Sequence, residues 1–360
     1  MIISTYKKYL FYKLLKKKII ICFIFFVIAM IINLLEEIGF LRDSKDTLFT
    51  PILLTFLNAP SLLYEMLPFI FLISTQLFFI DLNESGEIFT LRKFGIDNLE
   101  IIKFLIMTSL LISLIVIIIF YNFSSILKKQ YLMIKNSYAN DNKYLAVITK
   151  NGLWIKDSLD NQIIIINAKK IEVDHLIDSS VTILNNDFNI VENLVAKKIN
   201  IKDKNWELFD VLKTNEDNTS IKLKRLNIQS NFNYERINNL YSDLSSLTFL
   251  GLLKIEKDYK SIGYSTNEII IQKHSLYSFP FLLCAMTIIS SLIMINIKNK
   301  TSLFKNIGIG VLISVLLYYF KNFSNLLGEN DNLPLILSVW LPSIFLLSIS
   351  LIGIIKINEN

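Results

Sequence analysis

Apolar residues in this chain gather in six long runs, three in the first third of the sequence and three near its end. A helix needs about 20 apolar residues to cross the hydrocarbon core of a bilayer, and each run approaches that length. We therefore predict six membrane-spanning helices, spans 1 to 6, over residues 19–35, 62–80, 101–121, 276–297, 307–323 and 335–355. The polar region between spans 3 and 4 is predicted to fold as a separate domain.

The pattern changes inside this polar region, residues 122–270. Residues 124–138 and 238–260 have a helical period, whereas the segment between them consists of short runs rich in Val and Ile, separated by clusters of Asn and Asp. Many short strands at this spacing are typical of an antiparallel sandwich or jellyroll. The predicted strands are residues 144–149, 153–156, 162–167, 171–174, 181–184, 190–191, 195–202, 206–212 and 221–228.

The predicted fold class is therefore a membrane α-helical protein, with six transmembrane helices in a 3+3 arrangement and an inserted all-β domain that is jellyroll-like or sandwich-like. The expected division of the chain is residues 1–121, 122–270 and 271–360.

The distribution of lysine and arginine predicts the orientation in the membrane. The formal net charge is +6, and the basic residues of the short loops concentrate before span 1, between spans 2 and 3, and between spans 4 and 5. Because short cytoplasmic loops carry an excess of Lys and Arg, both termini are predicted to be cytoplasmic and the large domain periplasmic. The positive charge thus indicates topology and not nucleic-acid binding. Residues 1–18 alternate lysines with apolar residues, which predicts an amphipathic helix on the inner membrane surface.

The sequence lacks the patterns that are typical of an enzyme. It has no Gly-x-x-x-x-Gly-Lys-Ser/Thr loop, so the chain does not hydrolyse ATP by that route. Its two histidines, His175 and His274, have no second ligand at metal-binding spacing. Both cysteines, Cys22 and Cys284, lie within predicted spans, so the large domain must be stable without a disulfide. We expect no catalytic residue, no metal and no cofactor.

The loop between spans 2 and 3 is predicted to form a short helix over residues 86–94. Ser85 is placed to cap it, Glu87 lies in the first turn, where a negative charge is favoured, and Gly95 suits a left-handed end. The apolar side of this helix is predicted to consist of Ile88, Leu91 and Phe94. Such a helix either docks into a groove on a separate ATPase or merely connects two spans. The residues alone leave both interpretations open.

Several short motifs follow one another along nearly the whole chain. They are Pro-Ser-Leu-Leu-Tyr-Glu-Met-Leu-Pro at residues 60–68, Gly86-Glu87 with Arg92 and Gly95, Gly-Leu-Trp-Ile-Lys-Asp at residues 152–157, Ala196 with Trp206-Glu-Leu208, Gly263-Tyr264, His274 with Pro280, Gly308-Ile-Gly310, and Leu333-Pro334 with Trp340-Leu-Pro342. Each motif alone is weakly specific. Together, and within a three-plus-three topology, they resemble the LptF/LptG permeases of bacterial lipopolysaccharide export, and LptG more than LptF.

This resemblance implies a role in an ABC transporter. One LptF and one LptG form a heterodimer that is driven by two copies of the ATPase LptB. The heterodimer extracts lipopolysaccharide from the inner membrane and passes it along β-jellyroll domains to LptC and the periplasmic bridge protein LptA. In that family the loop glutamate contacts the ATPase, and Glu87 takes that role by position. The coupling residues implied are Glu87, Ile88, Leu91, Arg92, Phe94 and Gly95, and the sequence departs from the family in having Gly86 where serine is usual.

The resemblance also implies a lipid gate between span 1 and span 5 of the partner permease. LptG members often have lysines near the outer end of span 1, but the nearest positions here hold Asn33, Gly39 and Phe40. The candidate gate residues are Asn33, Glu36, Glu37, Phe40, Arg42 and Lys45 in or after span 1, and Gly310, Ser314, Tyr318 and Lys321 in span 5. Small residues let a neighbouring helix approach closely. Lys321 either binds an anionic head group or is an ordinary helix-end lysine that reaches the membrane surface.

In the large domain, acyl chains are expected to pass through an apolar cleft between two sheets. The candidate lining residues are Trp154, Ile199, Ile201 and Trp206. The alternative is that these side chains form a closed core.

The leading hypothesis is a permease subunit whose ATP is hydrolysed by a separate partner. The alternatives in the same class are LptF itself and a permease for another amphipathic lipid. An alternative from a different class is a membrane-anchored receptor or scaffold that transports nothing. A receptor has no need of an ATPase-docking helix, so co-purification with an ATPase discriminates between the two classes.

Overall fold

The computed structural model describes residues 5–42, 49–138, 153–159, 162–172, 174–185, 189–215, 219–234, 237, 243–261, 266–295, 302–330 and 332–358. These residues belong to two compact units. One is helical and consists of Met1–Lys129 with Asn267–Asn360, and the other, Gln130–Thr266, contains a β-sheet. The helices that lie wholly or partly in the first unit are α1 (Thr5–Phe40), α2 (Phe49–Glu84), α3 (Glu87–Lys93), α4 (Asn98–Ile115), the π-helical turn η1 (Val116–Tyr121), α5 (Asn122–Tyr138), α8 (Asn267–Ile295), α9 (Ser302–Glu329) and α10 (Leu335–Asn358).

The six predicted spans are confirmed as helices. Among the described residues, six helical segments are long and apolar enough to cross a membrane. Each predicted span lies within one of them, except for residues 296 and 297, which lie outside the described residues. The third segment runs from Asn98 through η1 into α5, so the helix predicted at residues 124–138 continues span 3.

The N-terminal segment differs from the prediction. We expected a surface helix over residues 1–18 that turns into span 1, whereas α1 runs without a break from Thr5 to Phe40. Leu10 and Leu14 are fully buried, in one cluster with Phe78 and Phe79 of α2. The apolar face of these first turns is therefore covered by protein, so it does not need a membrane surface to bury it.

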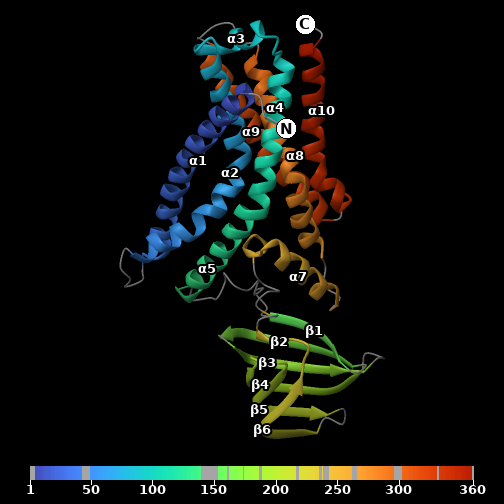
Figure 1. Ribbon diagram of the computed structural model, residues 1–360. Coiled ribbons are helices and arrows are strands. Elements are labelled where there is room, and N and C mark those ends of the chain that lie inside the picture. The colour runs from blue at the N-terminus through green and yellow to red at the C-terminus, as the bar shows by residue number, and fades with distance from the viewer. Residues whose placement is uncertain are drawn as a thin grey trace. The chain divides into compact units, whose positions relative to one another are not determined.

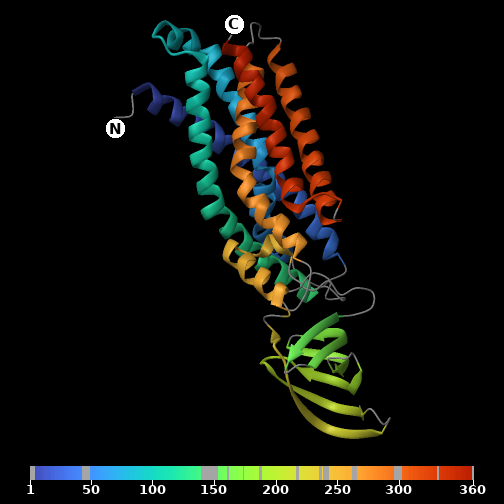
Figure 2. The ribbon, with the colours of Figure 1, turned by 90° about the vertical axis from the view of Figure 1, so that its right-hand side faces the viewer.

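Helix α8 lies at the centre of the helical unit, with α2, α4, α9 and α10 around it (Figures 1 and 2). Hydroxyl groups join the central helices. Ser290 of α8 donates a hydrogen bond to the Leu72 carbonyl of α2 at 2.8 Å, and the hydroxyls of Thr287 and Ser109 are 3.0 Å apart. Such bonds between helices, together with small side chains, stabilise helix packing where lipid provides no hydrophobic driving force.

The second unit contains a single antiparallel sheet in the order of the sequence. Its strands are β1 (Leu153–Leu159), β2 (Gln162–Glu172), β3 (His175–Leu184), β4 (Ile190–Asn200), β5 (Asn205–Asn215) and β6 (Ser220–Gln229), followed by η2 (Leu244–Ser246) and α7 (Phe249–Ser261). The inserted β domain is thus confirmed, but the described strands form one sheet where a sandwich has two. Predicted runs merge, since residues 162–167 and the first two residues of the run 171–174 lie in β2, and residues 190–191 and 195–202 contribute to β4. Residues 144–149 lie outside the described residues.

A crease crosses the sheet at Asp178 of β3 and Asp210 of β5. Asp178 of β3 and Asp210 of β5 have positive φ angles of 47° and 52°, and the pairing register skips these positions. On each side of the crease every second residue of a strand is buried. Across the crease, two successive buried residues are three positions apart, as in Ala196 and Ile199 or Leu208 and Val211. One position of each strand is left unpaired at the crease without a shift of register. The sheet is curved, and its buried side chains form one core (Figure 2).

The candidate cleft residues lie in this core. Ile199, Ile201 and Trp206 have no exposed surface, and the Trp206 indole donates a hydrogen bond to the Phe232 carbonyl at 2.8 Å. The expectation of an open cleft lined by these three side chains is therefore wrong for this structure, because the curved sheet closes over them. The side chain of Trp154 lies outside the described part of the chain.

Candidate functional site

The loop between α2 and α4 forms the short helix α3, one residue shorter at each end than predicted. Ser85 does not cap it. Helix α2 continues to Glu84, and the Ser85 hydroxyl donates back to the Asp81 carbonyl at 2.7 Å. Gly86 takes the N-cap position with a φ of 70°, a conformation that glycine adopts without strain.

The other end of α3 follows the prediction. Gly95 has a φ of 77°, its N–H donates to the Arg92 carbonyl, and the Ile96 N–H donates to the Leu91 carbonyl, both at 3.0 Å. These two bonds form a Schellman motif. Leu91 and Ile96 belong to the same apolar cluster, so the end of the helix is fixed by packing as well as by hydrogen bonds.

Helix α3 divides its apolar residues between two sides. Ile88 and Leu91 of the predicted apolar side contact the cluster of their own chain that contains Leu10 and Leu14. Phe94 does not join them, because it lies at the C-cap and is 79% exposed. Phe89 is 64% exposed, with the Lys93 ammonium 4.6 Å from its ring centroid. The exposed side of α3 therefore presents two aromatic rings, one of which the sequence analysis did not identify.

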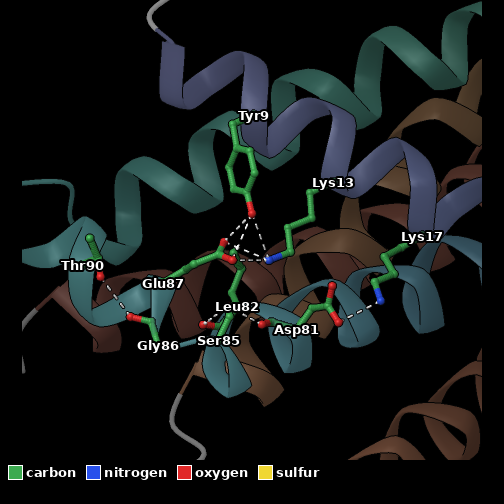
Figure 3. A network of polar contacts seen from close by, with 9 residues as sticks. All are labelled: Tyr9, Lys13, Lys17, Asp81, Leu82, Ser85, Gly86, Glu87 and Thr90. Carbon is green, nitrogen blue, oxygen red and sulfur yellow. Dashed lines mark hydrogen bonds and ion pairs between the residues drawn. The ribbon is translucent and has the colours of Figure 1, made fainter.

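The carboxylate of Glu87 is bound by α1 (Figure 3). Lys13 Nζ lies 2.8 Å from both carboxylate oxygens, and the Tyr9 hydroxyl lies 3.0 Å from both. Partial burial raises the pKa of Glu87, but hydrogen bonds from Lys13, Ser85 and Tyr9 lower it more, so the pKa falls below its usual value. Glu87 is therefore an ionised and oriented carboxylate at neutral pH.

Other contacts hold the same end of the bundle together. Lys17 forms an ion pair with Asp81 at 2.9 Å, and Tyr6 donates a hydrogen bond to Glu100 of α4. The Arg92 guanidinium donates to Asn98 Oδ1 at 3.0 and 3.2 Å. These residues of α1 were not predicted as part of the site, although Tyr9, Lys13 and Lys17 recur at the four-residue spacing of one helix face.

The candidate gate residues of span 1 fall into two groups. Asn33 is buried and accepts a hydrogen bond from Asn58 Nδ2 of α2 at 3.0 Å, and Glu37 has no exposed surface. These two side chains face their own chain. Glu36 and Arg42 are exposed and Phe40 is half-buried, while Lys45 lies outside the described residues.

In α9, Gly310 packs against α2 of the same chain. A Cβ on Gly310 would lie 2.4 Å from Gln76 Nε2, and the buried Ser314 donates to the Gly310 carbonyl. Tyr318 is 45% exposed, and Lys321 Nζ lies 5.8 Å from the Phe279 ring centroid. Both halves of the predicted gate thus contact α2, and the structure of this chain does not bring Lys321 together with the residues of α1.

An aromatic stack next to Lys321 was also missed. Tyr64 of α2 stacks on Phe279 of α8 with ring centroids 4.7 Å apart, and its other neighbour is Tyr121 of η1 at 5.3 Å. The three rings come from segments far apart in the sequence, so no local pattern predicts their contact.

Comparison with known proteins identifies the family. The sequence model for "Lipopolysaccharide export system permease LptF/LptG" matches residues 8–356, which include all six long helices and the sheet. No curated protein matches the chain. The match covers nearly the whole sequence, and the helices and inserted sheet are the architecture that the resemblance of motifs implied. The chain is a multi-pass membrane protein and belongs to the LptF/LptG family of lipopolysaccharide export permeases.

Proposed function

We propose that this chain is the LptG-type permease subunit of an ABC transporter in the bacterial inner membrane. It forms a heterodimer with an LptF-type permease, is driven by an LptB-type ATPase dimer, and extracts lipopolysaccharide towards LptC and LptA. The family match supports transport of lipopolysaccharide. The lysine-rich loops support an orientation in which α3 and both termini are cytoplasmic and the sheet is periplasmic.

The observation that carries the ATPase proposal is the exposed side of α3. This short helix is anchored by Ile88 and Leu91, yet it presents Phe89 and Phe94 outward, 64% and 79% exposed. A turn that only connects two spans has no use for two exposed aromatic rings in water. Aromatic side chains at the centre of a protein interface contribute much of its binding energy.

For the gate we propose the residues that the fold leaves accessible. Glu36, Phe40 and Arg42 at the end of α1 contact the lipid head group or the partner permease. Lys45 is added to them from its position in the sequence alone. Tyr318 and Lys321 of α9 contribute from the other side of the subunit, facing α1 of the partner. Asn33 and Gly310 support this gate from inside, since they hold α1 and α9 on α2. Glu37 and Ser314 are buried at the same levels of α1 and α9.

The test of the ATPase proposal is co-purification. A tagged chain with Phe89→Ser and Phe94→Ser should insert normally but bind the ATPase at least about tenfold more weakly, because loss of an interface aromatic commonly costs more than 1.4 kcal/mol. Thr90→Ala is the matched control, since Thr90 is exposed on α3 and, among the described residues, its hydroxyl bonds only to the Gly86 carbonyl. Undiminished ATPase binding by the double variant would reject the exposed side of α3 as the docking surface, whereas a wild-type chain that binds no ATPase would favour the alternative of a receptor or scaffold.

The remaining alternatives are LptF itself or a permease for another amphipathic lipid. Both keep α3 as the docking element and differ only in the partner or the cargo. Identification of the second permease in the purified complex distinguishes them.

A further inference from the structure

The two groups that bind Glu87, the Lys13 ammonium and the Tyr9 hydroxyl, each contact both oxygens of its carboxylate. Lys13 Nζ is equally distant from both oxygens, and so is the Tyr9 hydroxyl. Both donors therefore lie in the plane that bisects the line between the two oxygens. A guanidinium that binds a carboxylate through two parallel hydrogen bonds centres itself in this same plane. A basic side chain of a docking partner that contacts both oxygens would approach in the plane that already contains Lys13 Nζ and the Tyr9 hydroxyl, and would compete with them for Glu87.

The position of α3 does not depend on this contact. Ile88, Leu91 and Ile96 hold the helix in the apolar cluster, and Arg92 bonds to Asn98 of α4. Likewise, the first turns of α1 have other attachments, namely the buried Leu10 and Leu14 and the ion pair of Lys17 with Asp81. The Glu87 contact can open while both elements stay folded. The side chains of Lys13 and Glu87 are 14% and 28% exposed, so the contact lies within reach of a partner.

We propose that Tyr9, Lys13 and Glu87 form a latch between α1 and α3, and that docking of the ATPase opens it by taking over the Glu87 carboxylate with a basic group of its own. The inference rests on the proposed function, because it requires an ATPase that docks on α3. Tyr9 and Lys13 are then positioning residues, which bind Glu87 of α3 only while the ATPase is not docked.

The latch connects docking to the lipid-facing part of the chain. Helix α1 is continuous from Thr5 to Phe40, and its far end carries Asn33 and Glu37, which are buried where α1 contacts α2. Release at Lys13 frees one of the contacts that fix the orientation of this helix. Helices commonly transmit such events as small shifts or rotations.

The test measures the affinity of the LptB-type ATPase for the complete permease heterodimer in nanodiscs. Lys13→Met with Tyr9→Phe removes both donors and keeps their apolar bulk. A protein whose binding-competent state is only partly populated binds with an apparent affinity reduced by that fraction. Because the variant leaves Glu87 free, we expect its Kd for the ATPase to fall about tenfold, which is the change for a difference of 1.4 kcal/mol. Tyr9→Phe alone should have the same sign and a smaller size.

Lys17→Met is the matched control, because it removes the neighbouring lysine and its ion pair with Asp81 but leaves Glu87 bound. It should leave the Kd unchanged. An unchanged or higher Kd in the Lys13→Met, Tyr9→Phe variant overturns the latch, since it shows that the two residues do not compete with the ATPase. Failure of the wild-type heterodimer to bind the ATPase at all overturns the proposed function itself, and the latch with it.

Discussion

Three lysines of α1 differ in their surroundings, since two form ion pairs and the third is buried next to an aromatic ring. Lys13 and Lys17 each reach a carboxylate, at 2.8 and 2.9 Å. Lys18 is only 5% exposed, its Nζ has no hydrogen-bond partner among the described residues, and it lies 3.3 Å from the Phe71 ring centroid. A cation over an aromatic ring gains roughly 2 kcal/mol when desolvated, whereas the penalty for burying an unpaired charge is several kcal/mol. Lys18 therefore costs stability in its present position.

Replacement of Lys18 should accordingly be tolerated. Lys18→Met keeps the length and apolar stem of the side chain, and we expect it to be as stable as the wild type or up to about 2 kcal/mol more stable. Thermal unfolding in detergent measures this, with the exposed Lys16→Met as the matched control. A loss of more than about 1 kcal/mol would show that the contact with Phe71 outweighs the cost of burial.

At the scale of helices, the close contact of α9 with α2 depends on Gly310, which has no side chain. The Cβ of an alanine at Gly310 would lie 2.4 Å from Gln76 Nε2 and 2.7 Å from Leu72 Cδ2. Gln76 cannot easily move away, because it is fully buried and donates to the Asn306 carbonyl at 2.9 Å. Gly310→Ala should therefore destabilise the protein by about 1–3 kcal/mol, the usual cost of overpacking.

Gly308 provides the control for this prediction. A Cβ there meets no atom within 4 Å, and alanine is the better helix former by about 1 kcal/mol. Gly308→Ala should leave the melting temperature unchanged or raise it. Equal effects of the two substitutions would contradict the close packing of α9 on α2.

Elements defined by a local signal could be predicted from the sequence. The spans follow from the length of the apolar runs, and the end of α3 follows from Gly95, whose left-handed conformation the Schellman motif requires. The start of α3 could not be predicted in the same way. Ser85 suits either an N-cap or the last turn of α2, and the length of α2, set by its packing, decides for the second.

The directions of side chains depended on tertiary contacts and were predicted less well. Phe94 has the helical spacing of an inward residue but lies beyond the last helical turn, where it is exposed. Asn33 was assigned to a lipid gate by its position in the family, yet Asn58 of α2 binds it. The crease at Asp178 and Asp210 shifts the alternation of buried and exposed residues within the strands, which a strict period of two does not predict. The sequence pattern also indicated more and shorter strands than the described sheet contains.

At the scale of the whole molecule, membrane helices and a soluble sheet are folded as two compact units of one chain. The helical unit presents α3 with Phe89 and Phe94 exposed, and the sheet unit has a closed core made partly of Ile199, Ile201 and Trp206. In the proposed function the helical unit binds the ATPase that drives transport, and the sheet unit passes lipid towards the periplasmic bridge. A closed core means that the acyl chains must travel over another surface of the sheet, or that the core must open during transport.

The central claim is that this chain transports lipopolysaccharide with energy received through α3. The most direct measurement places the heterodimer and its ATPase in proteoliposomes that contain lipopolysaccharide, and follows transfer of the lipid to added LptC and LptA. We predict transfer that requires ATP and that falls at least about tenfold when Phe89→Ser and Phe94→Ser are introduced, while Thr90→Ala has no effect. Transfer that is equal with and without ATP, or that is unchanged in the double variant, would contradict the account.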